Sequence, residues 1–182
     1  MKNAAFLGSR TPFLLTFLAV SSLFGSAQMK VQPAAQADQS KLVQMVRQAT
    51  KQYVDVNNAT RDGYGPFLGC VSGSDHGAMG VHYVNGNLIN GTIDVEHPQA
   101  LIYEPEANGA MKLVGVEFIT YASTWLQTNS GPPVLGGQVF LYVDSPNRFN
   151  IPAFFELHVW AWRDNPQGAY VDWNNHVTCE HQ

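Results

Sequence analysis

The segment Phe154–Trp162 places one carboxylate and one imidazole inside a run of otherwise apolar residues. Successive side chains of a β-strand point to opposite faces, so Glu156 and His158 would share one face of this strand with Trp160. The other face would be wholly apolar. A strand covered on both faces gives ionisable groups little access to water, and burying such a group without a partner costs on the order of several kcal/mol. Glu156 and His158 therefore require polar partners from elsewhere in the fold.

Three other predicted strands each carry one isolated ionisable group among apolar neighbours. They are His82 in residues 78–84, Glu104 in residues 100–104 and Glu117 in residues 112–120. Strict alternation puts Glu117 on the face of Leu113 and Gly115, with Val114 and Val116 on the opposite face. We expect all five ionisable groups to converge inside a sheet that curves into a cup.

Two histidines and two carboxylates in such a cup match the ligand preferences of zinc, iron, manganese or copper. The candidate ligands of a divalent transition metal are His82, Glu117, Glu156 and His158. A metal with an open position could bind oxygen ligands or activate a water molecule.

Three other interpretations of these residues stay open. The first is an organic-ligand pocket without metal, lined by Tyr83, Tyr103, Glu104, Glu117, Glu156 and Trp160. The second is a non-enzymatic envelope module in which a His/Glu network, anchored on the tyrosines, only holds the fold together. The third is a hydrolase that uses Glu117 and Glu156 as acid and base. The sequence does not decide whether any reaction is catalysed, and it leaves the oligomeric state unknown.

The N-terminus has the organisation of a secretory signal peptide. Lys2 and Arg10 precede an apolar run, residues 12–24, which ends in the small residues 25–27. We therefore predict a signal peptide over residues 1–27, a flexible leader over residues 28–39 and a secreted or periplasmic location. The apolar run is shorter than the roughly 20 residues that span a bilayer, so we expect no membrane attachment after cleavage.

Charge and cysteine content narrow the partners further. Cleavage after residue 27 would remove two of the 10 Lys and Arg residues and none of the 14 acidic ones, so the net charge would fall from −4 to −6. An acidic chain without a basic cluster is a poor nucleic-acid binder, which leaves a small molecule or metal ion as the expected partner. Cys70 and Cys179 are the only cysteines, and in an exported chain we expect them to form a disulfide.

The remaining pattern predicts a single α+β domain over residues 40–182. Apolar residues recur at helical spacing between Ser40 and Asn57, which predicts an N-terminal amphipathic helix packed on the sheet. A loop is predicted for Asn57–Asp75 because of its glycines and proline. About five or six antiparallel strands follow, with the last in Ala169–Val171, as a strongly curved sheet or partial β-barrel.

Four sequence blocks carry a resemblance to a family. They are Gly77–Asn85 (GAMGVHYVN), Leu101–Pro105 (LIYEP), Leu113–Phe118 (LVGVEF) and Phe155–Trp162 (FELHVWAW). Together they resemble an uncharacterised family of small exported bacterial proteins, over roughly residues 70–179. The resemblance implies that these blocks form one domain, and it implies no activity.

Overall fold

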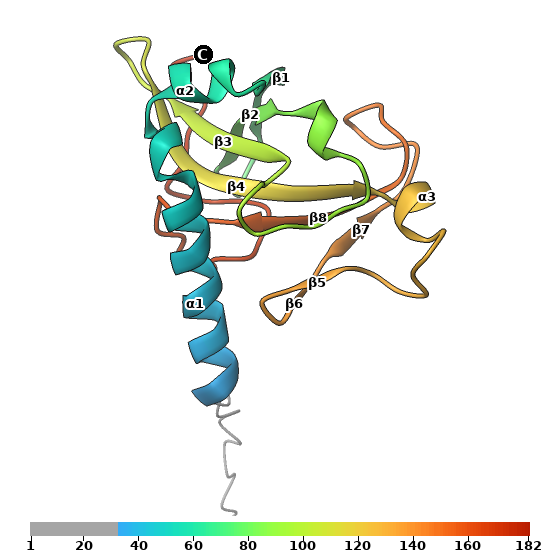
Figure 1. The fold of residues 1–182 in the computed structure, drawn as a ribbon. Helices are drawn as coiled ribbons and strands as arrows, with labels where there is room; N and C mark the ends of the chain where they lie inside the picture. Colours follow the sequence, from blue (N-terminus) through green and yellow to red (C-terminus); the bar gives the residue numbers. More distant parts are fainter. Residues whose placement is uncertain (1–32) are drawn as a thin grey trace, which may run out of the picture. The chain divides into compact units, whose positions relative to one another are not determined.

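An antiparallel sheet, strongly curled into a half-barrel, is the centre of the computed structural model, which describes residues 33–182 and their side chains from residue 41 onward (Figure 1). Its six strands are β1 (Gly65–Ser72), β2 (Ala78–Val84), β3 (Ala100–Pro105), β4 (Met111–Tyr121), β7 (Leu141–Val143) and β8 (Phe154–Val159). Across the sheet their order is β1-β2-β3-β4-β8-β7, because β8 returns to pair with β4. A separate hairpin consists of β5 (Val134–Leu135) and β6 (Gln138–Val139). The α+β class and the curved antiparallel sheet are thus confirmed.

Helices flank the sheet. They are α1 (Pro33–Thr50), η1 (Lys51–Val54), α2 (Val56–Arg61), η2 (Gly86–Leu88) and α3 (Ala122–Trp125). The first helix begins within the segment predicted as a leader, and the helical region is interrupted at residue 55. There the Asp55 side chain accepts a hydrogen bond from the Asn57 backbone N–H and so caps α2. The predicted signal peptide, residues 1–27, lies outside the described residues.

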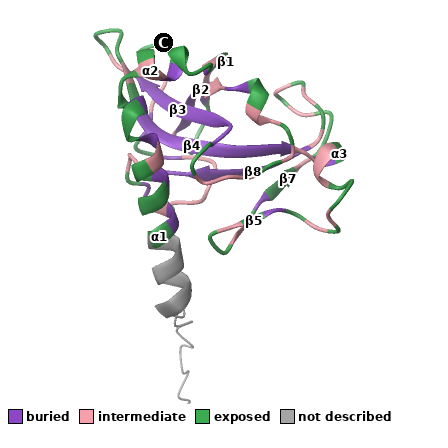
Figure 2. Ribbon diagram, viewed as in Figure 1, coloured by how far each residue is buried: buried purple, intermediate pink, exposed green. Residues whose placement is uncertain are grey.

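The central strands are buried on both faces, as their apolar composition requires (Figure 2). Every residue of β3 and of β8 is buried. On one face Leu42 and Val46 of α1 belong to the same buried cluster as Leu101, Phe118 and other strand residues, which is the main core. On the other face two smaller apolar clusters lie around Ile102 and around Phe154. Polar groups on that second face are therefore enclosed by apolar side chains.

A β-bulge changes the facing of the first part of β4. Ile102 pairs with Gly115, but the next residue of β3, Tyr103, pairs with Leu113, so Val114 is an extra residue on β4. Leu113 consequently lies in the main core and Val114 lies in the cluster around Ile102. The strict alternation expected from the sequence was wrong for these two residues. An inserted residue switches the side chains beyond it to the opposite face of the sheet.

Two segments differ from the sequence-based prediction. The predicted loop Asn57–Asp75 contains α2 and the edge strand β1. An edge strand can contain Pro66, because the missing N–H then costs no ladder hydrogen bond, and β1 accommodates its glycines through register shifts. The predicted strand Ala169–Val171 is instead a turn, although the Ala169 carbonyl accepts a hydrogen bond from the Trp160 N–H.

Candidate metal centre

Three strands each supply one donor group to the face opposite the main core. His82 is on β2, Glu117 on β4 and His158 on β8, and all three side chains are buried. The register pairs Glu117 directly with His158. Glu156, two residues before His158, shares the same face of β8. The sequence predicted that five groups converge; the structure brings these four close together, and the prediction was wrong for Glu104.

The curl of the sheet brings β2 and β8 together at this face. Strands β3 and β4 separate them, so in a flat sheet the two backbones would be roughly 14 Å apart. Nε2 of His82 is nevertheless 3.5 Å from Nε2 of His158. Ala100 on β3 pairs with Glu117, and it lies on the same face of β3 as Ile102, which pairs with His82. Gly115 on β4 leaves room for Trp160, since a Cβ there would lie 3.2 Å from the indole ring and 3.0 Å from the Val159 carbonyl oxygen.

The donor atoms have the spacing of metal ligands. Nε2 of His82 lies 3.3 Å from Oε2 of Glu117 and 3.5 Å from Nε2 of His158. The three residues each offer a donor atom within 4.8 Å of the others. Ligand atoms about 2.0–2.2 Å from a tetrahedral zinc lie about 3.3–3.6 Å from one another. These three buried residues can therefore hold a metal ion.

Burial shifts the pKa values of His82 and Glu117 toward the neutral form of each side chain. Burial, with a smaller effect of the neighbouring His158, lowers the pKa of His82 from 6.5 to about 3. Burial also raises the pKa of Glu117 well above its ordinary value, and the charge and hydrogen bond of Glu156 add to this effect. The 3.3 Å contact between His82 and Glu117 is thus not a charged pair near neutral pH.

The other nitrogen of the His158 ring faces an acid, Asp172. Nδ1 of His158 is 3.5 Å from Oδ1 of Asp172, and this buried nitrogen has no hydrogen-bond partner among the described residues. Glu156, His158 and Asp172 also offer donor atoms within 4.8 Å of one another. Asp172 was not predicted, because it lies in a turn well separated in sequence from the other donors and no residue pattern marks it.

A small apolar cavity opens onto the donor groups. His82, Glu117 and Glu156 form its polar part, and its other lining residues are apolar, among them Phe67 and Phe149. About 40 Å³ is open to the centre of a water-sized sphere, which is room for about three water molecules. Sites for drug-sized ligands measure about 300–1,000 Å³, so this cavity suits an ion with a few additional atoms.

Trp160 supports the ring of His158. The two rings are stacked, with centroids 6.1 Å apart and an interplanar angle of 22°. The indole Nε1–H donates a hydrogen bond to the Val171 carbonyl at 2.6 Å, beside Asp172. Trp160 thereby connects β8 to the segment that carries the acid on the far side of His158.

The two predicted tyrosines lie away from the cluster. Tyr103 is in the main core, where its hydroxyl donates a hydrogen bond to the Tyr53 carbonyl at 2.7 Å. Tyr83 packs edge-to-face on Tyr103, with centroids 4.9 Å apart. Tyr83 follows His82 along β2, and Tyr103 follows Ile102 along β3. Both tyrosine side chains therefore lie on the face of the sheet opposite the candidate metal ligands.

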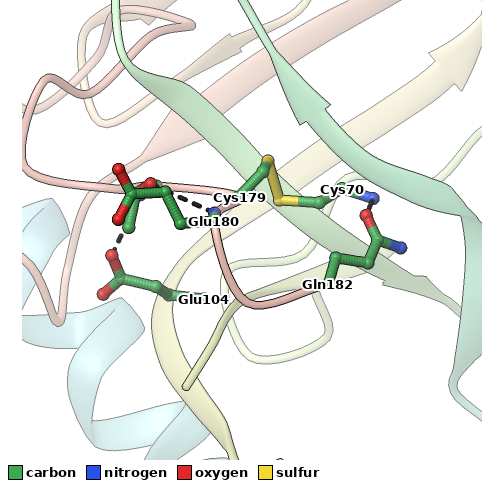
Figure 3. Close-up of a disulfide and its surroundings, with 6 residues drawn as sticks. Cys70, Glu104, Cys179, Glu180 and Gln182 are labelled. Carbon is green, nitrogen blue, oxygen red and sulfur yellow. Dashed lines mark hydrogen bonds between the residues drawn. A yellow bond between two sulfur atoms is a disulfide. The ribbon is translucent and has the colours of Figure 1, made fainter. Parts of the chain in front are cut away.

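Glu104 also lies apart and is bound to the C-terminal segment beside the disulfide (Figure 3). Its Oε1 accepts a hydrogen bond from the Thr178 N–H at 3.0 Å, and its Oε2 is 3.9 Å from a guanidinium nitrogen of Arg163. Cys70 and Cys179 form the predicted disulfide. Next to it the Cys70 N–H donates to the Gln182 side chain. The acid thus fixes the segment that follows Asp172.

The proximity of Glu117 and Glu156 bears on the paired-carboxylate interpretation. Glu156 contributes to the raised pKa of Glu117, so the two carboxyl groups lie near each other. Glycosidases separate their two carboxyl groups by roughly 5 Å or more. Two neighbouring buried carboxyl groups also suit the sharing of one proton or the binding of one ion.

Comparisons with known proteins do not identify a relative with this site. No family model, curated protein or solved structure matches the chain. The resemblance to an exported family therefore stays a prediction. In the part of the chain that the structure describes, no helix has both the length and the apolar character needed to cross a membrane. The disulfide is compatible with an extracellular location.

Proposed function

We propose that this protein is an exported domain that binds a divalent transition metal through His82, His158 and Glu117. The observation that carries the proposal is the convergence of three buried donor groups, from three different strands, at distances of 3.3 and 3.5 Å. Two imidazoles and one carboxylate are a donor set that both zinc and non-haem iron use with an open position. Such a metal supplies a Lewis acid that can hold water or a small oxygen ligand.

A purely structural network accounts less well for the contacts. Buried polar groups in native proteins are almost always satisfied by hydrogen bonds of good geometry. Here the two imidazoles face each other at 3.5 Å, beyond the range of about 2.7–3.2 Å that is usual for N–H hydrogen bonds. Nδ1 of His158 has no hydrogen-bond partner. Metal coordination would use the Nε2 lone pairs of both rings and would account for their approach.

The test is metal analysis of protein purified without a histidine tag. We expect stoichiometric Zn²⁺ or Fe²⁺, and we expect His82→Ala and His158→Ala to weaken binding more than about 100-fold, because each removes a direct ligand. Metal at 100 times its dissociation constant would raise the free energy of unfolding by about 2.7 kcal/mol, measured by chemical denaturation. The matched control is His97→Ala, an exposed histidine that pairs with Asp94.

Absence of tight metal binding by the native protein, with both buried variants merely less stable, would contradict the proposal. That result would support the structural network. The stability measurement is made on metal-loaded and chelated samples, so that loss of binding is distinguished from loss of folding.

Glu117→Gln separates ligation from packing. Because the pKa of Glu117 is raised, the folded chelated protein favours the neutral carboxyl, and an amide of the same shape should change the free energy of unfolding by less than about 1 kcal/mol. Metal affinity should fall about 10–100-fold, because an anionic ligand is lost. Isothermal titration with Zn²⁺ and urea unfolding of chelated protein measure the two effects.

The pH dependence of this variant has a defined sign. A carboxyl whose pKa is higher in the folded chain costs the native protein stability as the pH rises from 4.5 through the folded value. Glu117→Gln removes that cost, so the chelated variant should gain stability relative to the native protein on going from pH 5 to pH 9. Equal zinc affinity in the two proteins would exclude Glu117 as a ligand.

A further inference from the structure

We propose a second divalent-metal site on the opposite side of the His158 ring, formed by Asp172, Glu156 and Nδ1 of His158. The inference rests on the proposed function, because it assigns Nε2 of the same ring to the first metal. His158 would then be shared, with one ring nitrogen directed at each ion.

The state of His158 Nδ1 is the observation that points to a ligand. His158 is 1% exposed, and Nδ1 makes no hydrogen bond to any residue that the structure describes. Its distance of 3.5 Å from Oδ1 of Asp172 is long for a hydrogen bond. The same distance lies within the spacing of about 3.3–3.6 Å between two ligands of one tetrahedral ion.

One acid of this site is buried and the other is partly exposed to solvent. Glu156 is 4% exposed, whereas the side chain of Asp172 is 27% exposed. An ion could therefore enter from the side of Asp172 and keep water in its remaining positions. Glu156 is near both sites, since it lines the cavity with His82 and Glu117 and also offers a donor atom within 4.8 Å of those of His158 and Asp172.

Asp172 is held in place on both sides along the chain. Before it, the Val171 carbonyl accepts the hydrogen bond from the Trp160 indole. After it, Asn174 forms an isolated β-bridge with Ala78, with backbone hydrogen bonds of 3.1 and 3.2 Å in the two directions. The acid is therefore positioned by fixed backbone contacts, as ligands of a preorganised site are.

Charge balances with two ions. Glu117, Glu156 and Asp172 contribute three negative charges when ionised. Binding of metal by both ring nitrogens of His158 releases the ring N–H proton to solvent, and the resulting imidazolate adds a fourth. Two divalent cations supply four positive charges, so the buried cluster would be neutral.

Metal stoichiometry tests this proposal directly. The untagged protein is stripped with chelator, reloaded with Zn²⁺ and analysed by elemental analysis, with two ions per chain expected. Asp172→Asn should retain one ion, and His158→Ala should lose both. The matched control is Asp94→Asn, an exposed acid that pairs with His97, which should leave both ions bound.

Loading with Cu²⁺ tests the sharing of His158. Two copper ions joined by one imidazolate couple magnetically, so the integrated electron paramagnetic resonance signal should be far below that of two isolated ions. Asp172→Asn, with one copper, should give the full signal of one ion. Two uncoupled ions would overturn the shared ring.

One ion per native chain, with Asp172→Asn changing only its affinity, would also overturn the proposal. In that case Asp172 would act as an acceptor that orients His158 toward the first metal. No bound ion in the native protein is a different result, because it would contradict the proposed function itself.

Discussion

Replacing Cys70 and Cys179 together with alanine is expected to lower the free energy of unfolding by about 4–5 kcal/mol. The disulfide joins residues 109 positions apart. In the chain-entropy model, a cross-link that closes a loop of about 100 residues restricts the unfolded chain by about 4.7 kcal/mol. Urea unfolding of the oxidised native protein and of the double variant measures the difference.

Reductant supplies the control for this experiment. Reduced native protein should unfold at nearly the same urea concentration as the double variant, and the variant itself should not respond to reductant. A loss below about 1 kcal/mol would show that the unfolded chain gains little freedom when the bond is absent. Both experiments use chelated protein, so that metal binding does not contribute to the measured stability.

Gly77→Ala is expected to cost more than about 3 kcal/mol. Gly77 has a φ of +78°, and a Cβ added there would lie 2.2 Å from the carbonyl oxygen of Asn174. The left-handed conformation alone costs an alanine about 1–2 kcal/mol. The clash is with backbone, so relief requires the bridge between Ala78 and Asn174 to open. Thermal and urea unfolding measure the loss.

Gly109→Ala is the matched control for this substitution. Gly109 has a φ of +80°, nearly the same as Gly77, but a Cβ added there would have no neighbour within 4 Å. Only the conformational cost of about 1–2 kcal/mol should remain. Equal losses for the two variants would show that close packing against residue 174 does not matter. Because that bridge is next to Asp172, Gly77→Ala should also impair binding of the second ion.

The sequence was sufficient to predict four residues of the cluster, but it wrongly included Glu104 and missed Asp172. Alternation along a two-faced apolar strand placed Glu156 and His158 on one side, and the same reasoning brought in His82 and Glu117. Those predictions depended on the alternation of side chains within each strand and on the free-energy cost of burying an unpaired ionisable group. Both can be read from residues adjacent in the sequence.

The features that were missed depend on long-range geometry. The bulge at Val114 arises where β4 meets β3, so alternation within β4 alone could not reveal it. Asp172 reaches His158 through a turn whose position is set by contacts with Trp160 and Ala78. Glu104, like the other acids, lies among apolar residues of a buried strand. Its partner, the Thr178 N–H, comes from a segment distant in sequence, which the pattern within the strand could not reveal.

The small size of Ala100 bears on how other proteins with this arrangement of strands and ligands can be recognised. It supplies no donor atom, yet it lies on the strand between the one that carries His82 and the one that carries Glu117. A leucine there would have to fit a fully buried position that faces the acid across the two strands. A search for other chains of this kind should therefore require a histidine strand, a strand with a small residue paired with the acid, and a glutamate strand in succession.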